Sequence, residues 1–289
     1  KGDFEYYLDK QLEKLQTDSI DIYLLHALTK NDWDKVRKLR VLDFLDDSLS
    51  SGKIKHVGFS SHTEIDTFVD ILDAYPKWEV VLTQMNYLDE YYQTGVMGLD
   101  ELKRLNIGSM IMEPLRGGRL VQNIPPEVQK LWNGAEVKRT PVEWALEYLW
   151  NRDDVDCVLS GMNSLEQVRQ NIQIASDVKE ISEHDHDLIR EVARTYKTLT
   201  GNDCTCCGYC MPCPEDVDII NCFKEYNIGK MLNNPKGSAL QYFTLIDDDC
   251  RADSCINCGE CEFVCPQMLD IPQELEKVDE YFGREFNHF

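Results

Sequence analysis

The sequence has neither a long hydrophobic run nor a surplus of basic residues. No stretch approaches the ~20 consecutive apolar residues that a membrane-spanning helix needs. The 30 basic and 52 acidic residues leave a formal net charge of −22, and a field of this sign repels phosphate backbones and anionic membrane surfaces. The sequence therefore predicts a soluble protein with neither nucleic-acid nor membrane partners.

Cysteine, in contrast, is abundant and unevenly placed. Eight of the twelve cysteines lie in two runs near the C-terminus. The second run has the spacing C-x2-C-x2-C-x3-C-P, in which three thiolates bind one 4Fe–4S cluster and the fourth binds the other cluster of a two-cluster protein. We therefore predict crossed ligand sets. The first is Cys204, Cys207 and Cys210 with Cys265, and the second is Cys255, Cys258 and Cys261 with Cys213.

Two other interpretations of clustered cysteines fit this spacing less well. Disulfide-dense folds are small and secreted, whereas these cysteines occupy one part of a long chain without an apolar N-terminal segment. Zinc ribbons need two C-x2-C pairs per metal. Cys206, Cys222 and Cys250 fall outside the triplet spacing and are interpreted as packing or spare thiols, although Cys206 and Cys250 are near enough in sequence to replace a predicted ligand.

Thiolate-bound clusters persist in reducing surroundings, so the cysteines predict a cytoplasmic location. The first run also departs from the motif. Two residues separate Cys210 from Cys213, where the motif has three. Cys157 lies in an apolar segment and is expected to be an ordinary buried thiol.

Before the cysteine runs, short apolar segments alternate with amphipathic stretches, which is typical of repeated β–α units on a parallel sheet. The apolar residues of each strand are consecutive, so we expect each strand to be buried on both faces. The predicted strands are Ile20–Leu25, Lys55–Ser60, Val80–Gln84, Ser109–Met112 and Cys157–Ser160. The predicted helices are Phe4–Leu15, Trp33–Ser51, Glu64–Ala74, Leu99–Leu105, Pro141–Asn151, Leu165–Ser176 and Glu183–Thr198.

A change of composition at Gly201–Asp203 predicts a domain boundary, with one domain at residues 1–200 and a second at residues 201–289. The second domain is expected to contain a helical stretch over Val217–Leu232. A turn at Asn233–Gly237 should follow it.

His26 ends the predicted first strand, at the carboxyl end where β/α barrels place catalytic groups. A single histidine in an apolar context is usually structural, but five segments follow one another in a diagnostic order: IDIYLLH, GKIKHVGFSSH, LTQMNY, IMEPLRGGRL and LSGMNSLEQVRQNI. With these segments the chain resembles the aldo/keto reductase family, and more closely the branch with a C-terminal ferredoxin-like module. The resemblance covers nearly the whole chain. It implies an α/β fold of the (β/α)8 TIM-barrel type, with strands four to eight present, followed by an α-helical ferredoxin-like iron–sulfur domain.

The resemblance also implies roles for individual residues. His26 would hydrogen-bond the substrate carbonyl and polarise it for hydride attack. Three groups of residues would bind NADPH or NADH: Ser60, Ser61 and Gln84 at the nicotinamide carboxamide, Leu115, Arg116, Gly117 and Gly118 around the pyrophosphate, and Gly161, Gln167 and Asn171 at the adenosine half. The choice between NADPH and NADH stays open, because Ser160–Asn163 contains no basic residue that could bind the 2′-phosphate of NADPH.

The family's catalytic tyrosine, aspartate and lysine would precede Lys1, together with three strands and two helices. We therefore expect the chain to be a fragment of a complete oxidoreductase that acts on a small carbonyl or alcohol and exchanges electrons with a ferredoxin-type partner. No flavin motif is present to couple hydride transfer to single-electron transfer. The alternative is an iron–sulfur redox sensor or metabolite-binding protein with a non-catalytic barrel.

Overall fold

The computed structural model describes residues 2–286, and these residues form two compact units. The first unit comprises Lys1–Gly117 and Arg139–Ser182, and the second comprises Gly118–Lys138 and Glu183–Phe289. Helices α6 (Pro126–Gly134) and α9 (Glu183–Thr198) pack against each other in the second unit. The second unit therefore includes two helices that precede residue 200 together with the cysteine-rich segment. The domain boundary at residue 200 stays a prediction.

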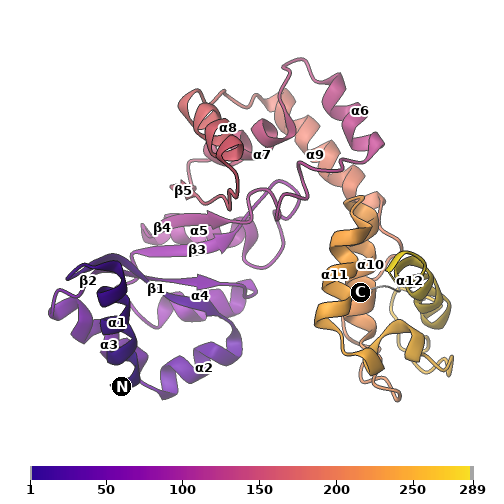
Figure 1. Ribbon diagram of the computed structural model, residues 1–289, viewed down its shortest axis with the longest axis horizontal. Helices are drawn as coiled ribbons and strands as arrows, with labels where there is room; N and C mark the ends of the chain where they lie inside the picture. The colour runs from indigo at the N-terminus through magenta and orange to yellow at the C-terminus, as the bar shows by residue number, and fades with distance from the viewer. Residues whose placement is uncertain (1, 287–289) are drawn as a thin grey trace. The chain divides into compact units, whose positions relative to one another are not determined.

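The first unit is built on a parallel sheet whose strands follow the order of the sequence (Figure 1). Each strand pairs in parallel with the next along the chain. This topology confirms the predicted β–α units. The strands are β1 (Ile20–Leu28), β2 (Ile54–Ser61), β3 (Val80–Gln84), β4 (Gly108–Met112) and β5 (Cys157–Val158).

Most helices of this unit lie where the sequence predicts them. They are α1 (Gly2–Leu15), α2 (Lys30–Lys38), α3 (Val41–Ser50), α4 (Ile65–Asp73), α5 (Gly95–Leu105), α7 (Pro141–Trp150) and α8 (Leu165–Ser176). The prediction of one continuous helix over Trp33–Ser51 is wrong. The chain breaks at Arg40, whose φ of 55° lies in the left-handed region and cannot continue an α-helix.

The prediction that every strand is buried on both faces is also wrong. In β3 and β4 buried residues alternate with half-buried ones, and most of β1 is exposed or half-buried. The alternation arises because one face of the sheet packs on the helices while the other stays partly open. Cys157, on the short edge strand β5, is exposed rather than buried.

The second unit is helical in the part of the chain that the structure describes. Helices α10 (Ile219–Met231), α11 (Pro235–Leu245) and α12 (Ile271–Phe286) pack on one another (Figure 1). They share a hydrophobic core in which the rings of Tyr242 and Phe282 stack at 4.4 Å. The sequence predicted α10 to within two residues, but α6, α11 and α12 were not predicted, and α11 begins within the predicted turn.

No helix within residues 2–286 combines the length and the apolar character needed to span a bilayer.

Candidate functional site

The two cysteine loops of the second unit share one backbone pattern. In each, the residue before the second cysteine and the glycine after it have positive φ: 57° at Cys206 and 81° at Gly208, and 58° at Asn257 and 74° at Gly259. Backbones that alternate in this way aim successive N–H groups into one concavity, a geometry that recurs at anion and iron–sulfur sites. Cys206 therefore occupies the position that Asn257 holds in the second loop.

Each loop lines a cavity together with a cysteine of the other loop. The larger cavity, of about 190 Å³, is bordered by Cys255, Cys258 and Cys261 from the second loop and by Cys213 from the first. The smaller, of about 20 Å³, is bordered by Cys204, Cys207 and Cys210 from the first loop and by Cys265 from the second. These groupings are the crossed sets that the spacing predicts. Cys210 borders both cavities, and Cys206 also borders the smaller one.

Within residues 2–286, no three His, Cys, Asp or Glu side chains converge as a single metal ion requires. A tetrahedral zinc site with Zn–S bonds of about 2.3 Å draws its four sulfurs to within about 4 Å of one another. The thiolates of a 4Fe–4S cluster each bind a different iron, so they need not approach one point. Residues 2–286 therefore contain no preformed site for a single metal ion.

Burial disfavours the thiolate form of Cys210, which borders both cavities, and of Cys261, which borders the larger. Burial raises the pKa of Cys210, and charges on Cys204, Cys207 and Cys265 would raise it further. Burial likewise raises the pKa of Cys261 to about 11. Close thiolates repel one another unless a cation neutralises them, and metal binding to such sites releases protons.

In the first unit, the predicted nicotinamide residues lie where β1, β2 and β3 end. His26 is exposed beside an irregularity in the pairing of β1 with β2. Its neighbour Ala27 donates from the backbone N–H to Ser60 Oγ at 2.6 Å, which brings His26 and Ser60 to the same edge. The Ser61 hydroxyl lies 2.7 Å from the Thr63 hydroxyl in a local turn.

Asp89 links the predicted nicotinamide and pyrophosphate residues. Its carboxylate accepts from Gln84 Nε2 at 3.3 Å and from Asn86 Nδ2 at 3.0 Å, and it lies 3.1 Å from Arg116 Nε. Sequence reasoning missed Asp89 and Asn86. The Asn-x-x-Asp spacing after β3 could have indicated these two residues, because it is typical of a side-chain-capped turn. In this turn Asn86 Oδ1 accepts from the N–H groups of Leu88 and Asp89.

The loop after β4 has features that suit a pyrophosphate. Arg116 Nη1 is buried and makes no hydrogen bond to any described residue. Gly117 and Gly118, with φ of 63° and 84°, hold the left-handed conformations that glycine adopts without steric cost. A buried N–H beside a glycine turn is suited to receive a phosphate oxygen, so these residues fit the nucleotide that the resemblance implies.

Gln167 and Asn171 both contact the segment that leads from β5 to α8. Gln167 Oε1 accepts from the backbone N–H of Asn163 at 2.9 Å, and Asn171 Nδ2 donates to Ser160 Oγ at 3.0 Å. Gly161 lies between these contacts with open space around its Cα. The three predicted adenosine residues are thus gathered at the carboxyl end of β5.

Comparison with known proteins finds likeness over the β–α part of the chain. A curated relative is the L-galactose dehydrogenase of Arabidopsis thaliana, 26% identical over 203 residues, in a match that covers 64% of this chain and 61% of that protein. The chain thus spans less than two thirds of the length of this relative.

Solved structures share the fold at lower identity. An aldo-keto reductase of Bacillus halodurans in its holo form matches with a TM-score of 0.54 and 22% identity, over 65% of each chain. A putative 2,5-diketo-D-gluconic acid reductase B matches with a TM-score of 0.52 and 20% identity, over 65% of this chain and 62% of that one. The sequence profile described as the aldo/keto reductase family matches residues 2–194. The chain therefore belongs to the aldo/keto reductase family.

Proposed function

We propose that the protein is an NAD(P)H-dependent oxidoreductase that also binds two 4Fe–4S clusters. The observation that carries the iron–sulfur part is the pair of cavities, because the lining of each contains one of the two crossed sets of four cysteines, with Cys210 in addition at the larger cavity and Cys206 at the smaller. This grouping matches the crossed ligation of two-cluster ferredoxins. The membership in the family supports the oxidoreductase part.

When bound, a nicotinamide supplies a hydride and a 4Fe–4S cluster supplies single electrons. The chain's own residues bind and orient the nucleotide and the substrate. His26 donates a hydrogen bond to the substrate carbonyl, and Gln84 and Ser60 hold the carboxamide at the ends of neighbouring strands. Arg116, held by Asp89, offers its unpaired Nη1 to the pyrophosphate. The substrate is a small carbonyl or alcohol, and a relative named as an L-galactose dehydrogenase supports a sugar-like one.

The iron–sulfur part is tested by metal analysis of the anaerobically purified protein. Two complete clusters require about eight irons and eight labile sulfides per chain, with visible absorbance that bleaches on reduction by dithionite. Zinc at a stoichiometric level without labile sulfide would overturn this part of the proposal.

The reductase part is tested by carbonyl-dependent oxidation of NADPH and NADH in the intact protein. We expect His26→Ala to lower kcat about 10²–10³-fold, the cost of removing one oxyanion-type donor, with little change in nucleotide affinity. His56→Ala is the control, because His56 pairs with Glu79 at the surface of β2. If the intact protein turns over no carbonyl or alcohol while its clusters cycle between redox states, the sensor function is favoured instead.

A further inference from the structure

We propose that the second unit docks a positively charged electron-transfer protein over its larger cysteine cavity. This inference rests on the proposed iron–sulfur function, since docking here serves electron transfer only when a cluster is bound. We call the surface formed by Tyr209, Ile256, Phe263 and Val264 the docking patch.

The docking patch is apolar and exposed. Tyr209, Ile256 and Val264 border the cavity of Cys213, Cys255, Cys258 and Cys261, and they are 70%, 62% and 50% exposed. Phe263, between Cys261 and Cys265, is 92% exposed. Single exposed apolar residues are ordinary, but several around one cavity mark an interaction site. Aromatic residues such as Tyr209 and Phe263 are enriched among those that dominate binding.

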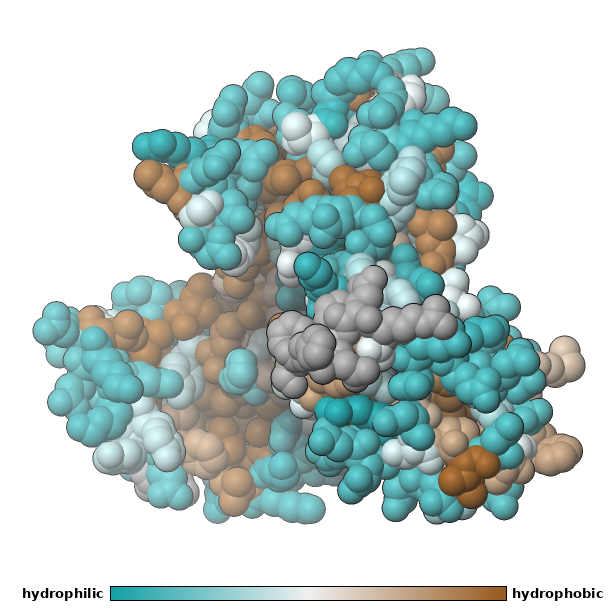
Figure 2. Space-filling view, turned by 45° about the vertical axis from the view of Figure 1, so that its right-hand side comes forward, coloured by the Kyte–Doolittle hydropathy of each residue, from teal (hydrophilic) through white to brown (hydrophobic). Residues whose placement is uncertain are grey.

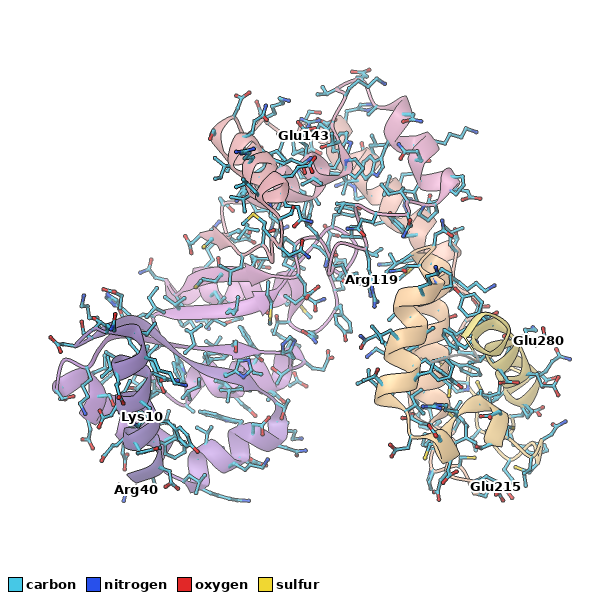
Figure 3. All side chains as sticks on the ribbon, viewed as in Figure 1. Lys10, Arg40, Arg119, Glu143, Glu215 and Glu280 are labelled. Atoms are coloured by element: carbon cyan, nitrogen blue, oxygen red, sulfur yellow. The ribbon has the colours of Figure 1, made fainter. Side chains whose placement is uncertain are left out.

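The charges around the patch determine what kind of partner fits. Glu215 and Glu260 border the same cavity, and the exposed Glu262 precedes Phe263. Residues 201–289 contain seventeen acidic and six basic residues. Figure 3 labels Glu215 at the loop end of the second unit, and Figure 2 shows apolar surface among hydrophilic side chains there. An apolar centre with a negative rim is complementary to a partner with a positive rim.

The two cavities differ in the exposed side chains that border them, and this difference selects the docking side. Both linings contain buried apolar residues, but the exposed Tyr209, Ile256 and Val264 border the larger cavity and not the smaller. A partner that contacts these side chains lies beside the larger cavity, which we therefore call the outer site. A reduced cluster bound there would pass one electron to an oxidised centre in the partner, without any bond being made or broken.

Anaerobic stopped-flow oxidation of the dithionite-reduced intact protein tests this assignment. Cytochrome c, a basic haem protein, is the docking acceptor, and ferricyanide, a small anion, is the acceptor that needs no patch. The charge variant is Glu260→Lys with Glu262→Lys, and its matched control is Glu276→Lys with Glu280→Lys, which changes the charge equally at two exposed residues of α12. The apolar variant is Phe263→Ser, with Leu240→Ser as its control, because Leu240 is a 62% exposed residue of α11.

We expect the rate with cytochrome c to fall with increasing salt and to fall about tenfold in the charge variant. Phe263→Ser should lower it several-fold at every salt concentration. The controls should keep the parent rate with both acceptors, and no patch variant should slow ferricyanide. Equal rates for patch and control variants in protein with full iron and sulfide content would overturn the docking proposal alone. Protein lacking iron and sulfide would instead overturn the proposed function beneath it.

Discussion

At the scale of single residues, Cys265 distinguishes crossed from local ligation. It follows the second cysteine triplet in sequence, yet it borders the cavity of Cys204, Cys207 and Cys210. The spacing predicts this grouping, because in this motif the fourth cysteine, after a longer step into proline, binds the other cluster.

We therefore expect Cys265→Ser to damage the cluster of the first loop and to leave the outer cluster intact. Electron paramagnetic resonance of the reduced protein, with iron analysis, measures which signal is lost. Cys206→Ser is the matched control. Cys206 borders the same cavity but takes the position of Asn257, so its loss should leave both signals unchanged. Disappearance of the outer signal in Cys265→Ser would mean that each loop binds its cluster with its own cysteines.

The roles of Cys206 and Asp89 could not be predicted from the sequence. The spacing left Cys206 as a potential ligand, and its equivalence to Asn257 appears only in the backbone dihedrals of the two loops. Asp89 was missed because its role depends on Arg116, which reaches it from the loop after another strand. Pairs of this kind are set by the packing of strands and not by any local pattern.

At the scale of elements, the sequence predicted all five strands and their parallel order but misjudged their burial. Apolar runs show that a strand can be buried, whereas the helices that pack on the sheet decide which face is covered. The break at Arg40 was missed because both flanking segments are amphipathic with the same period. Helices α11 and α12 were missed because the cysteine motifs dominate that part of the sequence.

Gly58, in β2, is an element-scale test of the sheet. A Cβ at this position would lie 1.9 Å from the carbonyl oxygen of Val80 in β3 and 2.7 Å from Leu24 Cδ2 in β1. Because backbone cannot give way as a flexible side chain does, Gly58→Ala should lower the free energy of unfolding of the first unit by about 1–3 kcal/mol.

Urea unfolding followed by far-UV circular dichroism measures this change. Gly161→Ala, in the loop after β5 of the same unit, is the control, since a Cβ there meets nothing within 4 Å. It should be neutral or stabilising by up to about 1 kcal/mol. Equal stability of Gly58→Ala and the parent would show that β2 and β3 lie further apart than described.

At the scale of the whole molecule, the two units differ in what stabilises them. The first has its core between helices and sheet, whereas cysteines of both loops pack against the core of the second, among them Cys204, Cys213, Cys255 and Cys265. Metal binding to such ligands contributes directly to the free energy of folding. The stability of the second unit should therefore depend on iron and that of the first should not.

We expect calorimetry of the anaerobic protein to show two unfolding transitions. An iron chelator should remove or strongly lower the one that coincides with loss of visible absorbance, while the other keeps its midpoint. Addition of the iron-loaded chelator serves as the control for binding of the chelator itself. A single transition that shifts as a whole would show that the two units unfold together.

Each loop contributes a cysteine to the cavity of the other loop, and this affects how the two sites would assemble their clusters. Neither cavity has a full set of thiols until both loops are folded, so completing one site brings the fourth thiol of the other into place. With the proposed clusters, half-loaded molecules of the parent protein would be rare intermediates. A titration of the iron-free protein would rise sigmoidally, and unfolding of either loop, unlike the loss of one cysteine, would remove ligands from both sites.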